Sequence, residues 1–315
     1  MTTPSVLVVG SVAYDDLEMP YGIFEDVLGG AAVYSSFASA LFAKTALVGV
    51  VGEDFKPGDV KKLEERSIDV QGLERAAGKT FRWRGRYSKD LSSRETLETH
   101  LNVFAEFSPK VAPELRNPRY LLLGNIHPAL QLGVLSQLEK PRFVAADTMN
   151  FWISGEPKLL NDVLGKIDLL LINDEEAREL SGISNIKKAA ADIRKRGPKH
   201  LIIKRGEHGA LLFDDQGTFY VPGFPLEDVR DPTGAGDTFA GGLFGYLAAK
   251  DDGKNAPLPE HCLRRAMLFA TASASFCVED VGSARLEQVS RKDVVARTKQ
   301  LLAMLDVGGT LALEA

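Results

Sequence analysis

Residues 231–237 read DPTGAGD and carry the most distinctive chemistry in the chain. Glycines and other small residues run directly into a helical pattern at Thr238, so several backbone N–H groups have no helical partner. Such a helix start, with its dipole, suits a phosphate group. The carboxylate of Asp237 would compete with that anion unless it takes a proton from an attacking hydroxyl group. The segment therefore predicts phosphoryl transfer to a hydroxyl; the plain structural alternative is a turn with Asp237 as N-cap.

A second motif, NDEE at residues 173–176, follows the apolar run 168–172 and opens a helical pattern. Mg²⁺ keeps several of its waters and needs only a few protein oxygens, which Asn173 and Glu176 could supply. In isolation the same residues are an ordinary helix cap with acidic side chains in the first turn. Their position ahead of DPTGAGD favours a metal and nucleotide site.

A turn with two glycines separates two apolar runs within residues 201–213. Gly206 and Gly209 would let the backbone come close to a nucleotide. Lys204 stands where its side chain could reach the phosphates, and a hairpin with solvated basic residues is the structural alternative. The turn is consistent with one edge of a nucleotide site.

The segment DPTGAGDTFAGG resembles the C-terminal signature of the ribokinase (PfkB) family of carbohydrate and nucleoside kinases. The resemblance runs from Gly10 to residues 277–282, which is nearly the whole chain. It implies that Asp237 is the catalytic base. It also implies an anion hole made by the backbone amides of Gly234, Ala235, Gly236 and Asp237.

The same resemblance implies the cofactors. Asn173 and Glu176 match the family's Asn-x-x-Glu element, which organises Mg²⁺ largely through water beside the phosphates of ATP. Lys204 and Gly206 match its Lys/Thr-x-Gly element. Family members that use a monovalent cation, K⁺, hold it with groups that correspond here to Asp231 and the Thr233 carbonyl. Ser275 is expected near the adenine ring by position alone.

The acceptor is expected in the N-terminal half. In the family an aspartate at the position of Asp15 grips substrate hydroxyls, which suits a carboxylate because it accepts charge-assisted bonds from neighbouring hydroxyls. Gly29 and Gly30 match a Gly-Gly signature that brings the backbone close to the substrate. This chain departs from ribokinases at Ala13 and Tyr34, where those enzymes usually carry asparagine. Ribose bound in the standard way is therefore not expected, although Tyr34 could stack on a ring or replace one hydrogen bond.

Further candidates follow the ends of two apolar runs. Asn125 comes after the run 120–123, and Asp147 comes after the run 143–146. Both are expected beside the acceptor, since ligands of open α/β sheets bind beyond the carboxyl ends of the strands.

Short apolar runs alternate with helical patterns along the chain. Uninterrupted runs such as 6–9 and 46–51 suit strands that are buried on both faces, as in a parallel sheet. The alternation predicts an α/β fold, and the resemblance makes it a ribokinase-like three-layer α/β/α sandwich within a single domain, residues 1–315. A polar, arginine-rich stretch at about 80–107, with about 13–24, is expected to form a small antiparallel β-sheet lid. Four lid arginines would suit an acidic acceptor, or else a solvated face or subunit contact: Arg82, Arg84, Arg86 and Arg94.

Composition restricts the partners. The 315 residues carry 38 Lys and Arg against 43 Asp and Glu, a net charge of −5, so bulk attraction to nucleic acid or to anionic lipid is not expected. The two cysteines make a disulfide framework improbable, and Cys277 is expected to be a small buried apolar residue. No run approaches the roughly 18–20 apolar residues that cross a bilayer, and the cytoplasm is the expected compartment.

The expected activity is transfer of the γ-phosphoryl group of ATP to a hydroxyl of a small sugar or polyol. A nucleoside acceptor is the first alternative within the same family. A non-catalytic nucleotide-binding protein is the alternative from another class, and Asp237, Asn173 and Glu176 speak against it. The resemblance also permits a homodimer that forms through the lid.

Overall fold

The computed structural model describes residues 4–253, 258 and 261–306. Its larger sheet has the strand order β13-β12-β11-β10-β9-β8-β1-β4-β5, and all neighbours from β11 to β5 are parallel. The strands are β1 (Val6–Val9), β4 (Thr45–Val51), β5 (Ile68–Arg75), β8 (Tyr120–Leu123), β9 (Phe143–Asp147), β10 (Leu169–Asn173), β11 (His200–Lys204), β12 (Ala210–Asp214) and β13 (Gly217–Val221).

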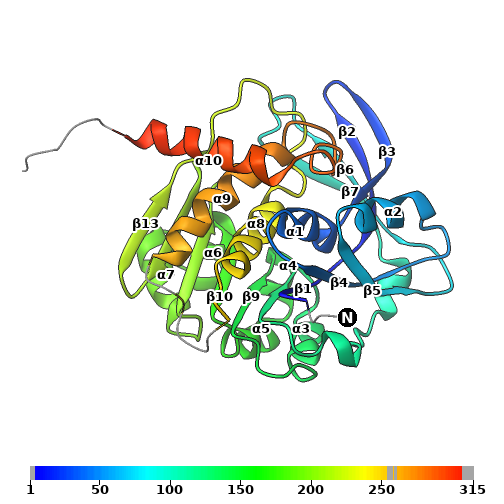
Figure 1. The fold of residues 1–315 in the computed structure, drawn as a ribbon, viewed down its shortest axis with the longest axis horizontal. Helices are drawn as coiled ribbons and strands as arrows, with labels where there is room; N and C mark the ends of the chain where they lie inside the picture. The colour runs from blue at the N-terminus through cyan, green and yellow to red at the C-terminus, as the bar shows by residue number, and fades with distance from the viewer. Residues whose placement is uncertain (1–3, 254–257, 259–260, 307–315) are drawn as a thin grey trace, which may run out of the picture.

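Helices cover both faces of this sheet (Figure 1). One face carries α1 (Ala31–Ala40), α8 (Ala235–Ala249), α9 (Cys262–Cys277) and α10 (Arg291–Leu305). The other face carries α3 (Pro128–Leu135), α5 (Pro157–Leu164), α6 (Asp174–Ser181) and α7 (Ile186–Arg194). Two further helices are α2 (Pro57–Glu65) and α4 (Asn150–Gly155), and three short 3₁₀ turns are η1 (Asn102–Glu106), η2 (Pro113–Leu115) and η3 (Gly206–His208).

The apolar runs of the sequence fill both sides of the sheet. In β1, Val6 and Val8 join the core beneath α1 and α8, whereas Leu7 and Val9 join the core on the opposite face. Successive residues of a strand point to opposite faces, so a strand that is covered twice must be apolar throughout. The three-layer α/β/α sandwich is thereby confirmed.

Two helices pack at unusually close range and set the position of the DPTGAGD segment. A methyl group on Gly241 of α8 would lie 2.7 Å from the Cα atom of Ser35 in α1. The Ser35 hydroxyl donates a hydrogen bond of 2.9 Å to the backbone carbonyl of Asp237. Because a larger residue at position 241 would force the two helices apart, glycine there holds the start of α8 against α1.

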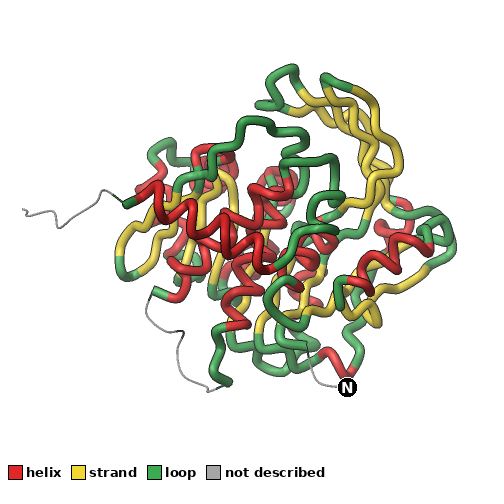
Figure 2. Tube along the Cα trace, turned by 45° about the horizontal axis from the view of Figure 1, so that its top comes forward, coloured by secondary structure: helices red, strands yellow, loops and turns green. Residues whose placement is uncertain are grey.

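A second, four-stranded sheet stands away from the body, with the order β3-β2-β6-β7 (Figure 2). Its strands are β2 (Ala13–Met19), β3 (Gly22–Gly29), β6 (Phe81–Tyr87) and β7 (Arg94–His100). The expectation of purely antiparallel strands was wrong at one seam, because β2 and β6 pair in parallel. Parallel neighbours need a long crossover, and residues 30–80 supply it by passing through the main sheet.

The end of the expected lid also differs. Residues 102–106 form η1 rather than a strand, and Val103 and Phe107 pack into the main core. The rings of Phe104 and Phe107 lie 5.6 Å apart and nearly parallel, so these aromatic residues join the small sheet to the body. Whether the small sheet opens and closes stays a prediction.

Candidate active site

The DPTGAGD loop is organised by its first aspartate. Asp231 is fully buried, and its two carboxylate oxygens accept 2.8 Å hydrogen bonds from the backbone N–H groups of Thr233 and Gly282. Gly234 then adopts a left-handed conformation (φ 74°) as the N-cap of α8. Asp231 thus joins two segments that are distant in sequence. The first amides of α8 follow directly after this loop.

Tyr34 lies directly beneath this turn. A methyl group on Gly234 would overlap the Tyr34 ring, so both the positive φ and the ring require glycine at position 234. The Tyr34 hydroxyl is buried and has no hydrogen-bond partner in the part of the chain that the structure describes. Burial, then the nearby charge of Asp15, raises the pKa of this hydroxyl well above its ordinary value.

Asp237, the expected base, lies in the first turn of α8. The pKa of its carboxyl group is raised to about 7, first by burial and then by the neighbouring charge of Asp147. Lys204 and Arg94 act in the opposite direction. A carboxylate with a pKa near neutrality is suited to take a proton from a hydroxyl and to release it again.

Lys204 connects the anion hole with Asp147. Its ammonium group forms an ion pair of 2.7 Å with the Asp147 carboxylate, and both side chains are largely buried. A methyl group on Gly236 would lie 3.1 Å from the same nitrogen, so the lysine stands beside the amides at the start of α8. The structure therefore places Asp147 beside Lys204 and near Asp237. Its assignment to the acceptor stays a prediction.

Asn173 and Glu176 form a reciprocal cap at the start of α6. The Glu176 N–H donates to Asn173 Oδ1 and the Asn173 N–H donates to Glu176 Oε2, both over 2.8 Å. The pKa of the Glu176 carboxyl group is raised to about 7 by burial and by the charge of Asp147, although Lys204 acts in the opposite direction. Asn173 and Glu176 thus form the helix cap that the sequence analysis gave as the structural alternative.

These acids also fit a divalent cation. Asp147 repels both Glu176 and Asp237 electrostatically, and the ammonium group of Lys204 interacts with all three acids. Mg²⁺ would relieve this repulsion through its waters, and one oxygen of Glu176 is not used by the cap. Within residues 4–253, 258 and 261–306 no three His, Cys, Asp or Glu side chains are grouped closely enough to hold a metal directly.

Asp15 of β2, the expected ligand of the acceptor, is 5% exposed. The pKa of its carboxyl group is raised to about 8 by burial and by the charge of Asp231, although Arg94 acts in the opposite direction. Its neighbour Asp16 points to the other face of the small sheet, where it accepts a hydrogen bond from the Asp26 N–H. Asp15 is therefore a buried carboxyl group near the loop that begins α8, as a ligand for substrate hydroxyls must be.

Gly29 and Gly30 fix the position of the Asp15 carboxyl group. A methyl group on Gly29 would lie 2.7 Å from Asp15 Cγ, and Gly30 has a φ of 97°. We predict that Gly29→Ala displaces the carboxylate and raises the KM for the acceptor by at least about tenfold. The KM for ATP should change little, and steady-state kinetics with each substrate varied in turn would show this. Equal KM values for the acceptor in the variant and the wild type would contradict the assignment of Asp15.

Three other candidates have structural partners. Asn125 Oδ1 accepts a hydrogen bond of 2.9 Å from the indole N–H of Trp152, and the Ser275 hydroxyl donates to the Ala272 carbonyl. A methyl group on Gly209 would overlap the β13 backbone, whereas one on Gly206 would meet nothing within 4 Å. Glycine at position 209 therefore allows two chain segments to approach closely, whereas Gly206 has open space beside it.

Some residues near the site were missed from the sequence. Gln131 donates through Nε2 to the Gly124 and Asp147 carbonyls, joining the ends of β8 and β9. Arg297 of α10 binds the Ser275 hydroxyl at 3.1 Å and pairs with Glu279 at 2.6 Å. A lone polar residue within a helical pattern gives no signal of these long-range contacts.

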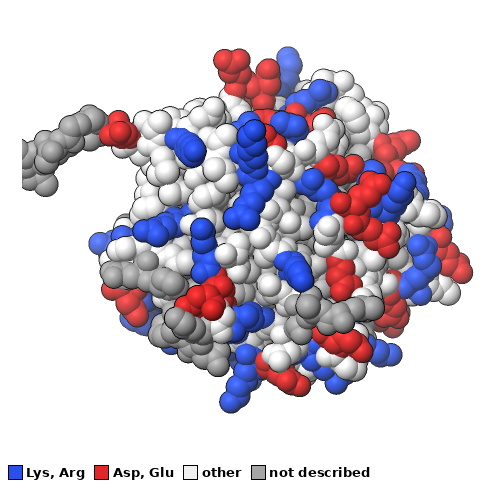
Figure 3. Space-filling view, in the orientation of Figure 1, with Lys and Arg blue, Asp and Glu red and all other residues white. Residues whose placement is uncertain are grey.

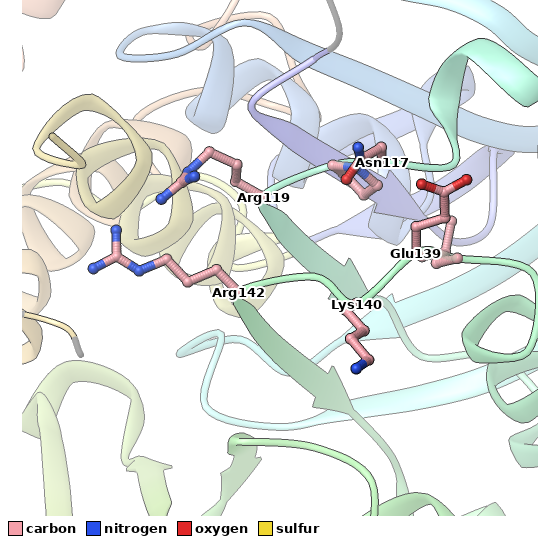
Figure 4. A pocket seen from close by; sticks show the side chains of 7 residues that line it. Asn117, Arg119, Glu139, Lys140 and Arg142 are labelled. Carbon is pink, nitrogen blue, oxygen red and sulfur yellow. The ribbon is translucent and has the colours of Figure 1, made fainter. Parts of the chain in front are cut away.

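A cavity lies elsewhere, at the amino ends of β8 and β9 (Figure 4). It is therefore at the opposite end of these strands from the candidate site. Arg119, on its wall, forms an ion pair of 2.7 Å with Asp251. The residues that line this cavity are Asn117, Pro118, Arg119, Leu138, Glu139, Lys140 and Arg142.

The fold, the glycine-rich start of α8 and the carboxyl groups of Asp237 and Asp15, whose pKa values are raised, fit an α/β phosphotransferase. The family model of pfkB family carbohydrate kinases matches residues 4–288. The chain therefore belongs to the pfkB family, and it is an ATP-dependent kinase that acts on a hydroxyl group.

Sequence relatives include a cytidine kinase of Thermococcus kodakarensis, 32% identical over 82% of this chain and 92% of its own length. A nucleoside kinase of Methanothermobacter thermautotrophicus is 25% identical over 81% of this chain and 79% of its own length.

Solved structures share the fold. A nucleoside kinase of Burkholderia thailandensis in complex with inosine superposes with a TM-score of 0.77 at 18% identity, covering 95% of this chain and 98% of its own. An Escherichia coli protein assigned as ribokinase II, with ATP and Mg²⁺, gives a TM-score of 0.76 at 18% identity, covering 95% and 100%.

Two surface properties bear on partners. On the face shown in Figure 3, acidic and basic side chains are interspersed, as expected from the net charge of −5. No helix among the described residues is both long enough and apolar enough to cross a membrane.

Proposed function

We propose that this kinase transfers the γ-phosphoryl group of ATP to a hydroxyl of a small sugar or polyol held by Asp15. The observation that carries the proposal is the half-buried Asp237 in the first turn of α8, with Lys204 between that turn and Asp147. The acceptor oxygen forms a bond to the γ-phosphorus while the bond from that phosphorus to the β,γ-bridging oxygen breaks. The hydroxyl proton goes to Asp237, and ADP leaves.

The remaining groups stabilise charge. The amides of residues 234–237 would receive the non-bridging oxygens of the phosphoryl group. Lys204 would lie near the phosphates, and Glu176 with Asn173 would hold Mg²⁺ through water. Mg²⁺ supplies charge neutralisation on the ATP phosphates. Positioning and electrostatics thus account for most of the proposed rate enhancement.

The test is release of ADP from ATP and Mg²⁺ in the presence of pooled sugars, polyols, nucleosides and sugar phosphates. A pool that stimulates release in the wild type but not in Asp237→Asn supports the proposal. Binding of ATP with no turnover on any pool would favour the non-catalytic alternative.

A nucleoside is the second candidate, and two observations favour it. One is the 32% identity to a cytidine kinase. The other is a ring cluster beyond the ends of β8 and β9, in which Trp152 lies 4.9 Å from the His127 ring and 4.8 Å from the 63%-exposed ring of Phe151. Aromatic surfaces suit a nucleobase. A nucleoside enzyme should phosphorylate cytidine or inosine with a higher kcat/KM than free ribose or fructose.

Potassium and a dimer are also proposed. Asp231 and the Thr233 carbonyl lie together at a buried turn, and a K⁺ ion there would act through the loop that precedes the anion hole. Replacing K⁺ by choline should then lower kcat. A homodimer would use the outer edge of the small sheet, where Ile23 is 67% exposed, and the molar mass in solution tests it.

The raised pKa of Asp237 predicts the pH dependence. A carboxyl group with a pKa of about 7 is protonated below that pH and cannot accept the hydroxyl proton there. We expect kcat/KM for the acceptor to rise with pH through about 7 to about 8, as Asp237 and then Asp15 lose their protons, and then to level off. A profile that stays flat from pH 5 to pH 8, with chemistry shown to be rate-limiting, would contradict the base assignment.

A further inference from the structure

Four arginines of the small sheet differ in their partners. Three are ion-paired with carboxylates of the same sheet: Arg82 with Asp16 and Asp26, Arg84 with Glu18 and Glu98, and Arg86 with Glu18 and Glu95. Arg94, at the start of β7, has no carboxylate within ion-pair distance among the described residues. Its guanidinium instead lies 5.5 Å from the centre of the Trp83 ring. The Trp83 ring thus holds the Arg94 guanidinium, and this cation is able to bind an anion.

The small sheet is attached to the DPTGAGD loop next to this arginine. Tyr87 lies opposite Arg94 in the β6–β7 register, and the positive charge of Arg94 acts on the Tyr87 hydroxyl by lowering its pKa. The Tyr87 hydroxyl in turn meets the Thr233 hydroxyl at 2.6 Å. The Tyr21 hydroxyl, at the β2–β3 turn, donates to the Arg230 carbonyl at 2.5 Å. Arg94 is therefore located over the turn that begins the anion hole.

The charge of Arg94 reaches acids on both sides of the cleft. It lowers the pKa of Asp15 on the acceptor side, of Asp231 and Asp237 around the turn, and of Glu176 on the nucleotide side. Coulomb interactions weaken with distance, so a cation that acts on four acids from separate elements has a central position. The transferring phosphoryl group must pass between Asp15 and the nucleotide side, through this same region.

We propose that Arg94 is a further catalytic residue, whose guanidinium binds the oxygens of the phosphoryl group in transit, opposite the amides of residues 234–237. The inference rests on the proposed function. A guanidinium presents two parallel N–H donors to a phosphoryl group and remains charged at every working pH. The interaction is strongest while negative charge is spread over the phosphoryl oxygens during transfer, so it stabilises the transition state more than either substrate.

The test compares Arg94→Ala, Arg94→Lys and Arg86→Ala in the full chain, with both substrates saturating. We expect Arg94→Ala to lower kcat on the order of 10²-fold and Arg94→Lys to lower it less, since lysine keeps the charge but loses the paired donors. Arg86→Ala is the matched control: it also removes a cation from the sheet, yet it leaves kcat within about threefold. A kcat of Arg94→Ala within about threefold of the wild type would overturn the proposal.

Whether Arg94→Ala changes kcat or KM shows which phosphate Arg94 binds. Loss in kcat with an unphosphorylated acceptor assigns Arg94 to the group in transit. A rise only in the KM of a phosphorylated acceptor would assign it to a phosphate that the acceptor carries, and would overturn the proposal. Asp237→Asn is assayed in parallel to separate failure of this inference from failure of the proposed function. If Asp237→Asn is inactive and Arg94→Ala has normal activity, only the role of Arg94 is wrong. If both variants have normal activity, the proposed function is wrong.

A pH profile separates catalysis from a merely structural role. Asp237 faces Asp147, Lys204, Asp15, Cys277 and Arg94, and of these Lys204 and Arg94 lower its pKa. Without Arg94 the pKa of Asp237 rises, so the acid limb of kcat/KM should move to higher pH in Arg94→Ala but not in Arg86→Ala. An unmoved limb would place Arg94 away from the base and contradict the central position assigned to it.

Discussion

Asp237→Asn is expected to lower kcat by at least about 10²-fold, because it removes the group that accepts the hydroxyl proton. The substitution changes little else. Asparagine keeps the size of the side chain, and the Asp237 backbone carbonyl keeps its hydrogen bond from the Ser35 hydroxyl. The anion hole is made of backbone amides and survives, so ATP should bind with a dissociation constant within about threefold of the wild type.

The measurement is single-turnover phosphoryl transfer, together with calorimetric titration of ATP in Mg²⁺. With acceptor saturating, the acid limb near pH 7 should vanish in Asp237→Asn along with most of the rate, since the variant lacks the carboxyl group that takes the proton. Near-normal turnover with an unchanged limb would show that another residue is the base.

Asp15→Asn is expected to have opposite effects on activity and on stability. The pKa of Asp15 is raised to about 8 because the carboxyl group is buried near Asp231. Hydroxyls of the acceptor would bind the ionised form most strongly, so the substitution should lower kcat/KM for the acceptor by about 10²-fold. The buried carboxyl group would thus lower the stability of the kinase but would be needed to bind the acceptor.

The stability effect depends on pH with a definite sign. The folded-state pKa of Asp15 lies above its unfolded value of 3.8, so folding opposes ionisation and its cost grows as pH rises from about 4 to about 8. At pH 8 the free energy of unfolding of Asp15→Asn should exceed that of the wild type, because asparagine carries no charge that folding must bury. The difference should shrink towards pH 5, and urea unfolding at both pH values measures it. A less stable variant at pH 8 would show that the carboxyl group has a stabilising partner.

Much of the fold follows from local patterns. Runs such as 143–146 have no polar position, and only a strand covered on both faces explains that. The DPTGAGD segment was similarly readable, because glycine with a positive φ at position 234 and small residues at a helix start are local requirements. Burial of Cys277 is likewise confirmed.

Long-range pairing was less predictable. The parallel seam between β2 and β6 joins residues more than sixty positions apart, and no local pattern specifies it. The ion pair of Lys204 with Asp147 depends on the order of β9, β10 and β11 in the sheet. Likewise the four lid arginines look equivalent in the sequence, and only the folded sheet separates Arg94 from its paired neighbours.

The most direct test of the central claim is acceptor-dependent ADP formation by the wild type and by Asp237→Asn, with ATP, Mg²⁺ and K⁺, across cytidine, inosine, ribose and fructose. We predict that at least one acceptor stimulates ADP formation in the wild type, that its phosphate ester accumulates in equal amount, and that the variant loses at least about 10²-fold of this rate. Equal rates in the two proteins, or no phosphate ester from any sugar or nucleoside while ATP binds, would contradict the account.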